Sequence, residues 1–118
     1  MDLTYDDRDG IRIIALKGRM DLEGAAAIDL RFTTLTATER PFVIVDLSEV
    51  DFMASMGLAT LVRAAKAARL REGKMVLLNP KTAVREVLAA TRIDQVLPVY
   101  VDLDEARLAV RTASSSIG

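Results

Sequence analysis

Two groups of side chains in the middle of the sequence have the composition to do chemistry. Asp46, Glu49 and Asp51 form a tight carboxylate cluster, and carboxylate oxygens are ligands for Mg²⁺. Such clusters are more often solvated turn residues, and we expect that role here. A few residues later Ser55 stands in the segment ASMGL, where a hydroxyl can accept a phosphoryl group or cap a helix.

The residues around Ser55 bear on both roles of its hydroxyl. Serine is a favoured N-cap, worth about 1 kcal/mol over alanine, and local rules by themselves favour this role. Gly57 follows in the first turn, where glycine costs a helix up to ~1 kcal/mol, and its missing side chain would leave the hydroxyl uncovered. Phe52, Met56 and Leu58 make the surroundings apolar. A phosphate there would be tolerated by a helix N-terminus and would repel a docked partner.

The composition limits what else the chain can do. Its 118 residues include no histidine and no cysteine, which removes the commonest general base, thiol chemistry and disulfides. There is no GxxxxGK[ST] loop and no GxGxxG fingerprint, so we expect no cofactor, no metal and no enzymatic activity. The formal net charge of -1 gives no overall attraction to nucleic acid or to anionic membrane.

The sequence also carries no sign of export or membrane insertion. The N-terminal residues lack the basic start and apolar run of a secretion signal. No apolar stretch approaches the roughly 18 residues that are needed to cross a bilayer. We therefore expect a cytoplasmic protein without a membrane span.

The elements that would position these residues alternate between strands and helices. The expected strands cover residues 3–7, 11–18, 42–47, 74–79 and 96–101. Helices are expected to begin at Asp21, at Ala54 or Ser55, at Asn79 and at Asp102. Gly73 suits the C-cap of the second helix.

This order predicts right-handed crossovers and one α/β domain. Its central sheet would be mainly parallel, with four to five strands flanked by about four helices. We place the domain at residues 1–113 and a flexible C-terminal tail at residues 114–118. The sequence leaves the oligomeric state open, with a homodimer as one alternative.

The carboxyl ends of the strands are the expected place for function. In open α/β sheets ligands and partners gather at that edge, which would bring Asp21, Asp46, Glu49, Asp51 and Ser55 together. Asp21 by itself is more often a helix cap than a binding residue.

A row of basic side chains recurs on the second expected helix. Arg63, Lys66 and Arg69 follow at three-residue spacing, opposite the apolar positions of that helix. This pattern is typical of the solvated side of an amphipathic helix. As an alternative, the row forms one patch of a partner interface, with Arg63 as a contact.

Residues 43–80, VIVDLSEVDFMASMGLATLVRAAKAARLREGKMVLLNP, strongly resemble the STAS domain of bacterial anti-sigma factor antagonists. The resemblance extends over nearly the whole chain, through LKGRMD at 16–21 and TRIDQVLPVYVDLDEA at 91–106. It implies a protein that binds an anti-sigma factor, a serine kinase of the GHKL ATPase type, and so frees a sigma factor. It also implies that the kinase phosphorylates the antagonist and that a PP2C-type phosphatase reverses this.

The family signature Asp-Ser-[Ser/Thr/Ala]-Gly-Leu corresponds here to residues 54–58, Ala-Ser-Met-Gly-Leu. By resemblance Ser55 is the phosphorylated serine, and Asp21 matches an aspartate that contacts the kinase. The same resemblance makes Ala54, Met56, Gly57 and Leu58 partner-binding residues. Ala54 replaces the usual aspartate and Met56 replaces a small residue, and both changes affect how the hydroxyl is positioned for a kinase.

Three alternatives stay open at this point. The first is a STAS module without a phosphorylation switch, in a lipid-transport or stress-sensing complex. The second is a receiver domain phosphorylated on aspartate, but a receiver needs a lysine after its last strand and the final lysine here is Lys81. The third is an independent enzyme, which would have to depend on the carboxylate cluster.

Overall fold

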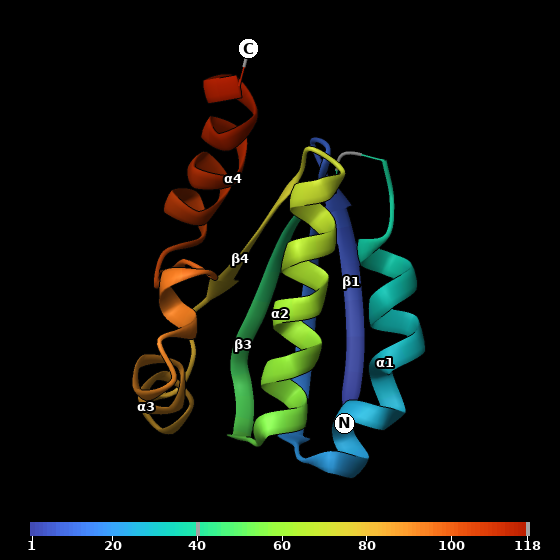
Figure 1. Cartoon of the computed structure of the whole chain (residues 1–118), viewed down its shortest axis with the longest axis vertical. Coiled ribbons are helices and arrows are strands. Elements are labelled where there is room, and N and C mark those ends of the chain that lie inside the picture. The colour runs from blue at the N-terminus through green and yellow to red at the C-terminus, as the bar shows by residue number, and fades with distance from the viewer. Residues whose placement is uncertain (40, 118) are drawn as a thin grey trace.

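A five-stranded sheet with four α-helices forms the structure, a computed structural model that describes residues 1–39 and 41–117, with side chains up to residue 111 (Figure 1). The strands are β1 (Asp2–Arg8), β2 (Ile11–Met20), β3 (Phe42–Met53), β4 (Lys74–Leu78) and β5 (Val99–Tyr100). The helices are α1 (Leu22–Thr36), α2 (Ser55–Leu70), α3 (Thr82–Ala90) and α4 (Leu103–Ile117), with a short 3-10 helix at Ile93–Gln95.

The sheet has the sequential order β1-β2-β3-β4-β5. β1 pairs antiparallel with β2, and the other three pairings are parallel. The edge strand β1 is rich in charged residues and the other edge strand, β5, is short, as the sequence indicates. The predicted single α/β domain with a mainly parallel sheet is therefore confirmed.

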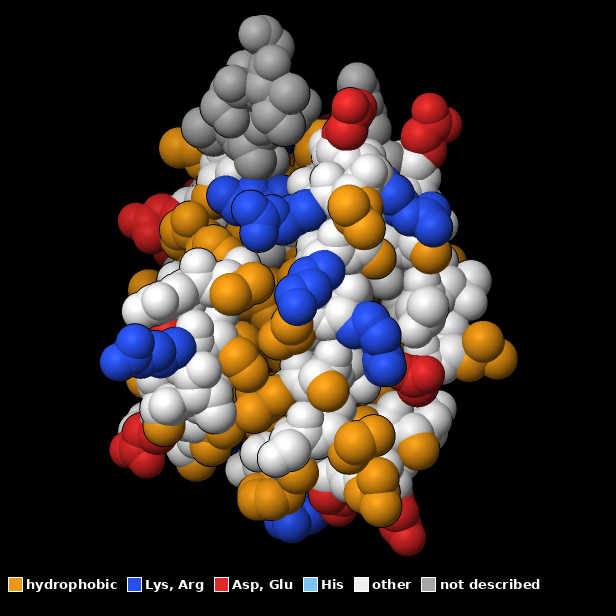
Figure 2. Space-filling view, in the orientation of Figure 1, with side chains coloured by type: hydrophobic (Ala, Val, Ile, Leu, Met, Phe, Trp, Pro, Cys, Tyr) orange, Lys and Arg blue, Asp and Glu red, His pale blue; other side chains and the backbone are white. Residues whose placement is uncertain are grey.

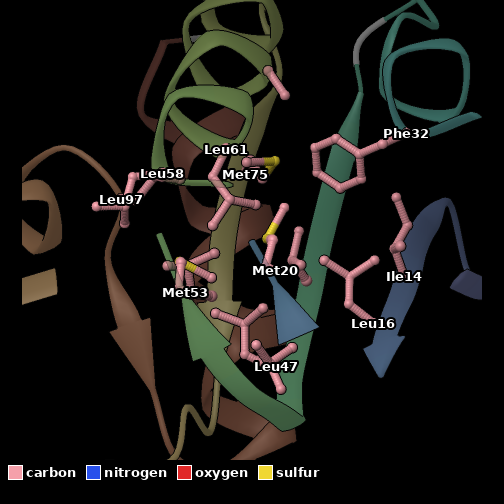
Figure 3. Close-up of a cluster of buried hydrophobic side chains, with 14 of the residues drawn as sticks. Ile14, Leu16, Met20, Phe32, Leu47, Met53, Leu58, Leu61, Met75 and Leu97 are labelled. Carbon is pink, nitrogen blue, oxygen red and sulfur yellow. The ribbon is translucent and has the colours of Figure 1, made fainter. Parts of the chain in front are cut away.

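Helices cover both faces of the sheet. The larger core joins one face to α1, α2 and α3, and Figure 3 shows its central side chains. Phe32 and Leu61 lie fully buried there between the helices and the strands. The smaller core joins Ile44 and Val76 of the opposite face to Ala106 and Val110 of α4. Because the first part of β3 and most of β4 are buried on both faces, these stretches are nearly continuous apolar runs.

β3 is longer than the predicted strand at 42–47. It continues to Met53 and gains extra residues relative to β2, with register shifts opposite Ala15–Lys17 and Gly18–Arg19. At the first shift the Asp46 carboxylate accepts a hydrogen bond from the amide of Ser48 at 2.9 Å. Bulges of this kind bend a strand and change the direction of its side chains. The residues after Asp46 are largely polar, so the sequence gives no sign that the strand continues through the bulges.

Two predicted helix boundaries are wrong. The C-cap of α2 is Arg71, and Glu72 adopts the left-handed conformation with φ of 64°. Gly73 is needed for a different reason, because a Cβ atom there would clash with the backbone of Pro41. At the next helix the N-cap is Lys81 rather than Asn79, and Asn79 itself has a φ of 50°.

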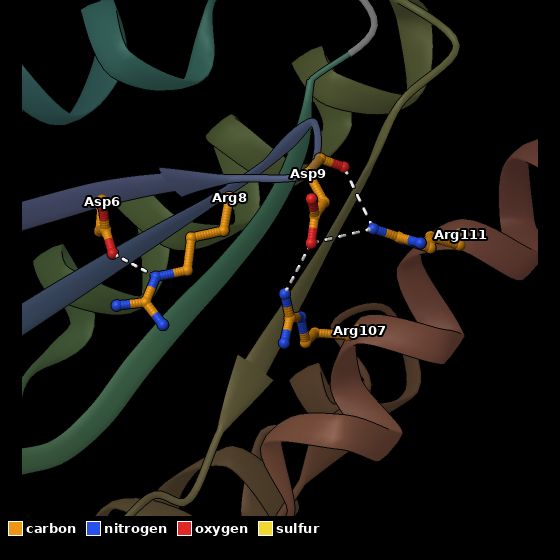
Figure 4. A network of polar contacts seen from close by, with 5 residues as sticks. All are labelled: Asp6, Arg8, Asp9, Arg107 and Arg111. Atoms are coloured by element: carbon orange, nitrogen blue, oxygen red, sulfur yellow. Dashed lines mark hydrogen bonds and ion pairs between the residues drawn. The ribbon is translucent and has the colours of Figure 1, made fainter.

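The β1–β2 turn is tied to α4 by charged groups (Figure 4). Asp9 accepts hydrogen bonds from Arg107 through its carboxylate at 3.3 Å and from Arg111 through its carbonyl at 3.2 Å. Asp6 and Arg8 form a separate ion pair within β1 at 2.6 Å. Asp9 therefore connects the first turn of the chain to its last helix.

Within the described residues no helix is long and apolar enough to cross a membrane. The backbone of α4 is helical to Ile117. The predicted domain boundary at residue 113 and the tail at residues 114–118 stay a prediction, since the side chains there and Gly118 lie outside the described residues.

Candidate functional site

Ser55 is the first residue of α2 and is exposed. The N-cap is Ala54, which has extended backbone angles and offers no side chain to cap the helix. Of the two expected helix starts Ala54 is the N-cap, so Ser55 does not take the capping role that local rules by themselves favour. Among the described residues the Ser55 hydroxyl makes no hydrogen bond, so it stands accessible at a helix N-terminus whose first amides lack a side-chain partner.

The turn before Ser55 is fixed by contacts with the end of β2. The amide of Ala54 donates to the carbonyl of Met20 at 2.9 Å. Gly57 is buried in the first turn of α2, and a Cβ atom on it would lie 2.7 Å from Cγ of Met20. This close packing, rather than the uncovering of the hydroxyl, is why glycine is needed at residue 57.

Large apolar side chains are exposed in the segments that meet here. Met56 is 50% exposed, Phe52 is 40% exposed and Leu22 is 63% exposed. Figure 1 shows the starts of α1 and α2 and the end of β3 at the same, lower end of the molecule. The predicted apolar surroundings of Ser55 are therefore at least partly accessible, as a docking surface requires.

Asp21 caps α1 at this same edge. Its carboxylate accepts a hydrogen bond from the amide of Gly24 at 2.8 Å and lies 3.6 Å from Nε of Arg19. The Gly24 amide, with help from the Arg19 charge, holds the pKa of Asp21 below its usual value. The predicted capping role is confirmed, and the carboxylate stays ionised and half-exposed beside the candidate site.

The predicted carboxylate cluster does not assemble into one site. The Asp46 carboxylate accepts a hydrogen bond from the Ser48 amide in the same strand, and Glu49 is exposed opposite Lys17 of β2. Asp51 pairs with Nζ of Lys81 at 2.6 Å, and this hydrogen bond lowers the pKa of Asp51. The residues lie on strand β3 rather than in a turn, and the described part of the chain contains no group of acidic side chains that could hold a metal ion.

The remaining predicted partner contacts differ in accessibility. Gly57 and Leu58 are buried, so they support the exposed residues from beneath. Arg63 is exposed about two turns beyond Met56, and its guanidinium donates to Asp29 of α1 at 3.0 Å. Contact of any of these residues with a partner stays a prediction.

The comparisons with known proteins decide the family. Residues 2–106 match the sequence model of the STAS domain. The chain belongs to the STAS domain family. This STAS domain is 30% identical over 113 residues to BtrV of Bordetella bronchiseptica, which carries the name of an anti-sigma factor antagonist, and the match covers 96% of this chain and 97% of BtrV.

Two further relatives carry related names. The anti-sigma-F factor antagonist RsfB of Mycobacterium tuberculosis is 26% identical, over 92% of this chain and 88% of RsfB. The crystal structure of an anti-sigma factor antagonist from Mycobacterium paratuberculosis is 27% identical, with a TM-score of 0.83 and 93% of each chain covered. The STAS fold of this chain thus agrees with a solved structure along nearly its whole length.

Sequence reasoning missed Arg19 as a residue of this edge. Its guanidinium lies 4.5 Å from the ring centroid of Phe52, within the range of a cation–π contact. Arg19 and Phe52 are cross-strand partners at the ends of β2 and β3. The register shift in β3 sets this pairing, so only a correct alignment of the two strands could have revealed it.

Proposed function

We propose that this STAS domain is an anti-sigma factor antagonist whose binding to a GHKL-type serine kinase is controlled by phosphorylation of Ser55. The observation that carries the proposal is the accessible Ser55 hydroxyl, at the first residue of α2 and beside exposed apolar side chains. The names of the relatives support the general role of antagonist. The proposed partners place the protein in the cytoplasm.

The unphosphorylated protein binds through the apolar residues around Ser55. Met56 and Phe52 supply accessible apolar surface, and Ala54 leaves space next to the hydroxyl. Asp21 adds a fixed negative charge, because its hydrogen bond with Gly24 keeps the carboxylate ionised. An anti-sigma factor held on this surface cannot hold its sigma factor at the same time.

Phosphorylation ends this binding without unfolding the domain. The kinase transfers the γ-phosphoryl group of ATP to Oγ of Ser55, ADP leaves, and the serine proton passes to a base of the kinase. The phosphate brings about -1.5 to -2 charges, which the unpaired amides and the dipole at the start of α2 stabilise. The partner surface then meets a bulky dianion in place of a small hydroxyl. A PP2C-type phosphatase restores the hydroxyl with water and releases inorganic phosphate.

The test uses the purified GHKL-type serine kinases of the source genome, each mixed with this protein. With Mg-ATP, we expect mass spectrometry to find one phosphate on Ser55, and none on the Ser55→Ala variant. Without ATP, calorimetry should detect binding of the wild type and of Ser55→Ala, and at least tenfold weaker binding of Ser55→Asp. Binding that is equal for Ser55→Asp and wild type would contradict the switch.

A STAS subunit without a switch is the second candidate. Ala54 and Met56 favour it, since both differ from the family signature beside the hydroxyl. Kinase binding with no phosphate on Ser55 after prolonged incubation would support constitutive binding. Copurification with a transport ATPase and permease, together with no binding to any kinase, would support a role in lipid transport.

A further inference from the structure

The charge on α2 is of one sign. Its 16 residues include the cations Arg63, Lys66 and Arg69 and no aspartate or glutamate. The chain as a whole has a formal net charge of -1, so the rest of the chain is acidic. In the orientation of Figure 2, blue side chains run over the middle of the molecule where α2 lies, beside a hollow with orange side chains.

The cations share the solvent side of α2 with small and apolar residues. With 3.6 residues per turn, the residues at 55, 59, 62–63, 66 and 70 follow one line along the helix. Ser55, Ala59, Lys66 and Leu70 are exposed on it, and Val62 is half-buried. We call this surface the α2 stripe, and it includes Met56, Arg63 and Arg69 at its margins.

Two of the three cations are available to a partner. Arg63 is engaged by Asp29 of α1 at 3.0 Å. Lys66 and Arg69 are exposed, and the structure gives neither an ion pair with any described residue. Ala59 between them and Ser55 permits close approach of another backbone.

We propose that the α2 stripe is a docking surface for an acidic amphipathic helix of the partner protein. The apolar side chains of Met56, Ala59, Val62 and Leu70 give a second helix a surface to pack against, and the cations select acidic residues at its flanks. The inference rests on the proposed function only for the identity of the partner, which is the anti-sigma factor. The stripe begins at Ser55, so the helix would extend that interface along about 24 Å of α2.

Nucleic acid and anionic lipid fit this surface less well. Binding to a phosphate backbone relies on many neutralised phosphates, and each cation near a lipid surface contributes only about 1 kcal/mol. Two unpaired cations on a net acidic protein fall short of either. The apolar residues of the stripe also require a partner with apolar side chains of its own.

The experiment measures binding of charge-reversed variants to the kinase that binds the wild type. Lys66→Glu and Arg69→Glu should each weaken binding about three- to tenfold, mainly through slower association, and raised salt should reduce the difference. The matched control is Lys17→Glu, an exposed lysine of β2 that alternates with the buried Leu16 and so points to the opposite face of the sheet. It should bind within twofold of the wild type. Thermal melts verify that all variants are folded.

The outcomes separate this inference from the proposed function. Suppose that Ser55→Asp abolishes kinase binding while Lys66→Glu and Arg69→Glu bind like the wild type. The antagonist role then holds, and the proposal that the α2 stripe docks a partner helix is overturned. If no kinase binds, the docking surface is tested with a model helix. This is a lactam-stapled 16-residue peptide that has leucines along one side and flanking glutamates. Adding this peptide should shift the NMR signals of the α2 amides of the wild type. The proposal is supported if these shifts are lost in the double variant Lys66→Glu/Arg69→Glu and are absent with a lysine-flanked peptide.

The same peptide titration tests the other polyanions. Poly(U) RNA, or vesicles of equal phosphatidylcholine and phosphatidylglycerol, are added to the wild type in place of the peptide. Tighter binding of either one than of the glutamate peptide, or the absence of α2 shifts with that peptide, would overturn the proposal.

Discussion

A Cβ atom placed on Gly57 would lie 2.7 Å from Cγ of Met20 and 3.0 Å from the Met20 carbonyl oxygen. The same carbonyl accepts the hydrogen bond of the Ala54 amide. The end of β2 therefore touches α2 on both sides of Ser55, once through Ala54 and once through Gly57. These two contacts set where the first turn of α2 stands and how far Ser55 projects from the sheet.

We predict that Gly57→Ala destabilises the fold by about 1–3 kcal/mol, although alanine is the better helix former. Urea denaturation at neutral pH measures the free energy of unfolding. The control is the same substitution in a Met20→Ala background, where the side-chain clash is absent and the cost of Gly57→Ala should be clearly smaller. An equal cost in both backgrounds would show that the contact with the Met20 side chain is not the cause.

Substitution of Ala54 is predicted to raise the stability of the protein. The Ala54 backbone already has the extended angles of an N-cap but its side chain accepts no hydrogen bond. Ala54→Asp and Ala54→Ser should therefore stabilise the protein by about 1 kcal/mol, because a side-chain oxygen would pair with a free amide of the first turn. Urea denaturation measures the gain. Ala59→Ser, an exposed change within the same helix, should bring no gain.

Asp21 makes the stability of α1 depend on pH. Its pKa in the folded state is lower than the usual value of 3.8, chiefly because the Gly24 amide donates to it. The stabilisation is thus present above the unfolded pKa and is lost as the pH falls through the folded one. We expect Asp21→Ala to be less stable than the wild type at neutral pH, with the gap closing as the pH falls through the folded pKa of Asp21.

Asp21→Asn serves as the control for this pH effect, since asparagine caps helices as well as aspartate but does not titrate. Its stability relative to Asp21→Ala should change little with pH. A gap between wild type and Asp21→Ala that is as wide in acid as at neutral pH would contradict the assignment. Both are measured by urea denaturation across the pH series.

The link between Asp9 and α4 predicts a local effect. Asp9→Ala removes the carboxylate that Arg107 contacts at 3.3 Å, so α4 should open more often. We expect amide hydrogen exchange at the start of α4 to become roughly two- to fivefold faster. Asp6→Ala removes an ion pair within β1 alone and should leave exchange in α4 unchanged. Equal effects of the two variants on hydrogen exchange in α4 would show that the contact of Asp9 with Arg107 does not hold α4 in place.

Local patterns in the sequence were sufficient for the overall architecture. The apolar runs of β3 and β4 indicate burial on both faces, and the structure has them at the centre of the sheet. Asp21 is a cap that depends on its near neighbour Gly24 and was predicted correctly. Gly73 was assigned to a C-cap, because the approach of Pro41 comes from 32 residues away and leaves no local pattern.

The sequence by itself determined the alternation of strands and helices, their apolar faces and the position of Ser55 at the start of the second helix, because each depends on neighbours within a few residues. Tertiary structure decided the rest. It placed Met20 against Gly57, Arg19 over Phe52 and Lys81 beside Asp51. These pairs depend on strand register, on the irregularities in β3 and on how helices settle on the sheet, which are set by packing of residues far apart in the chain.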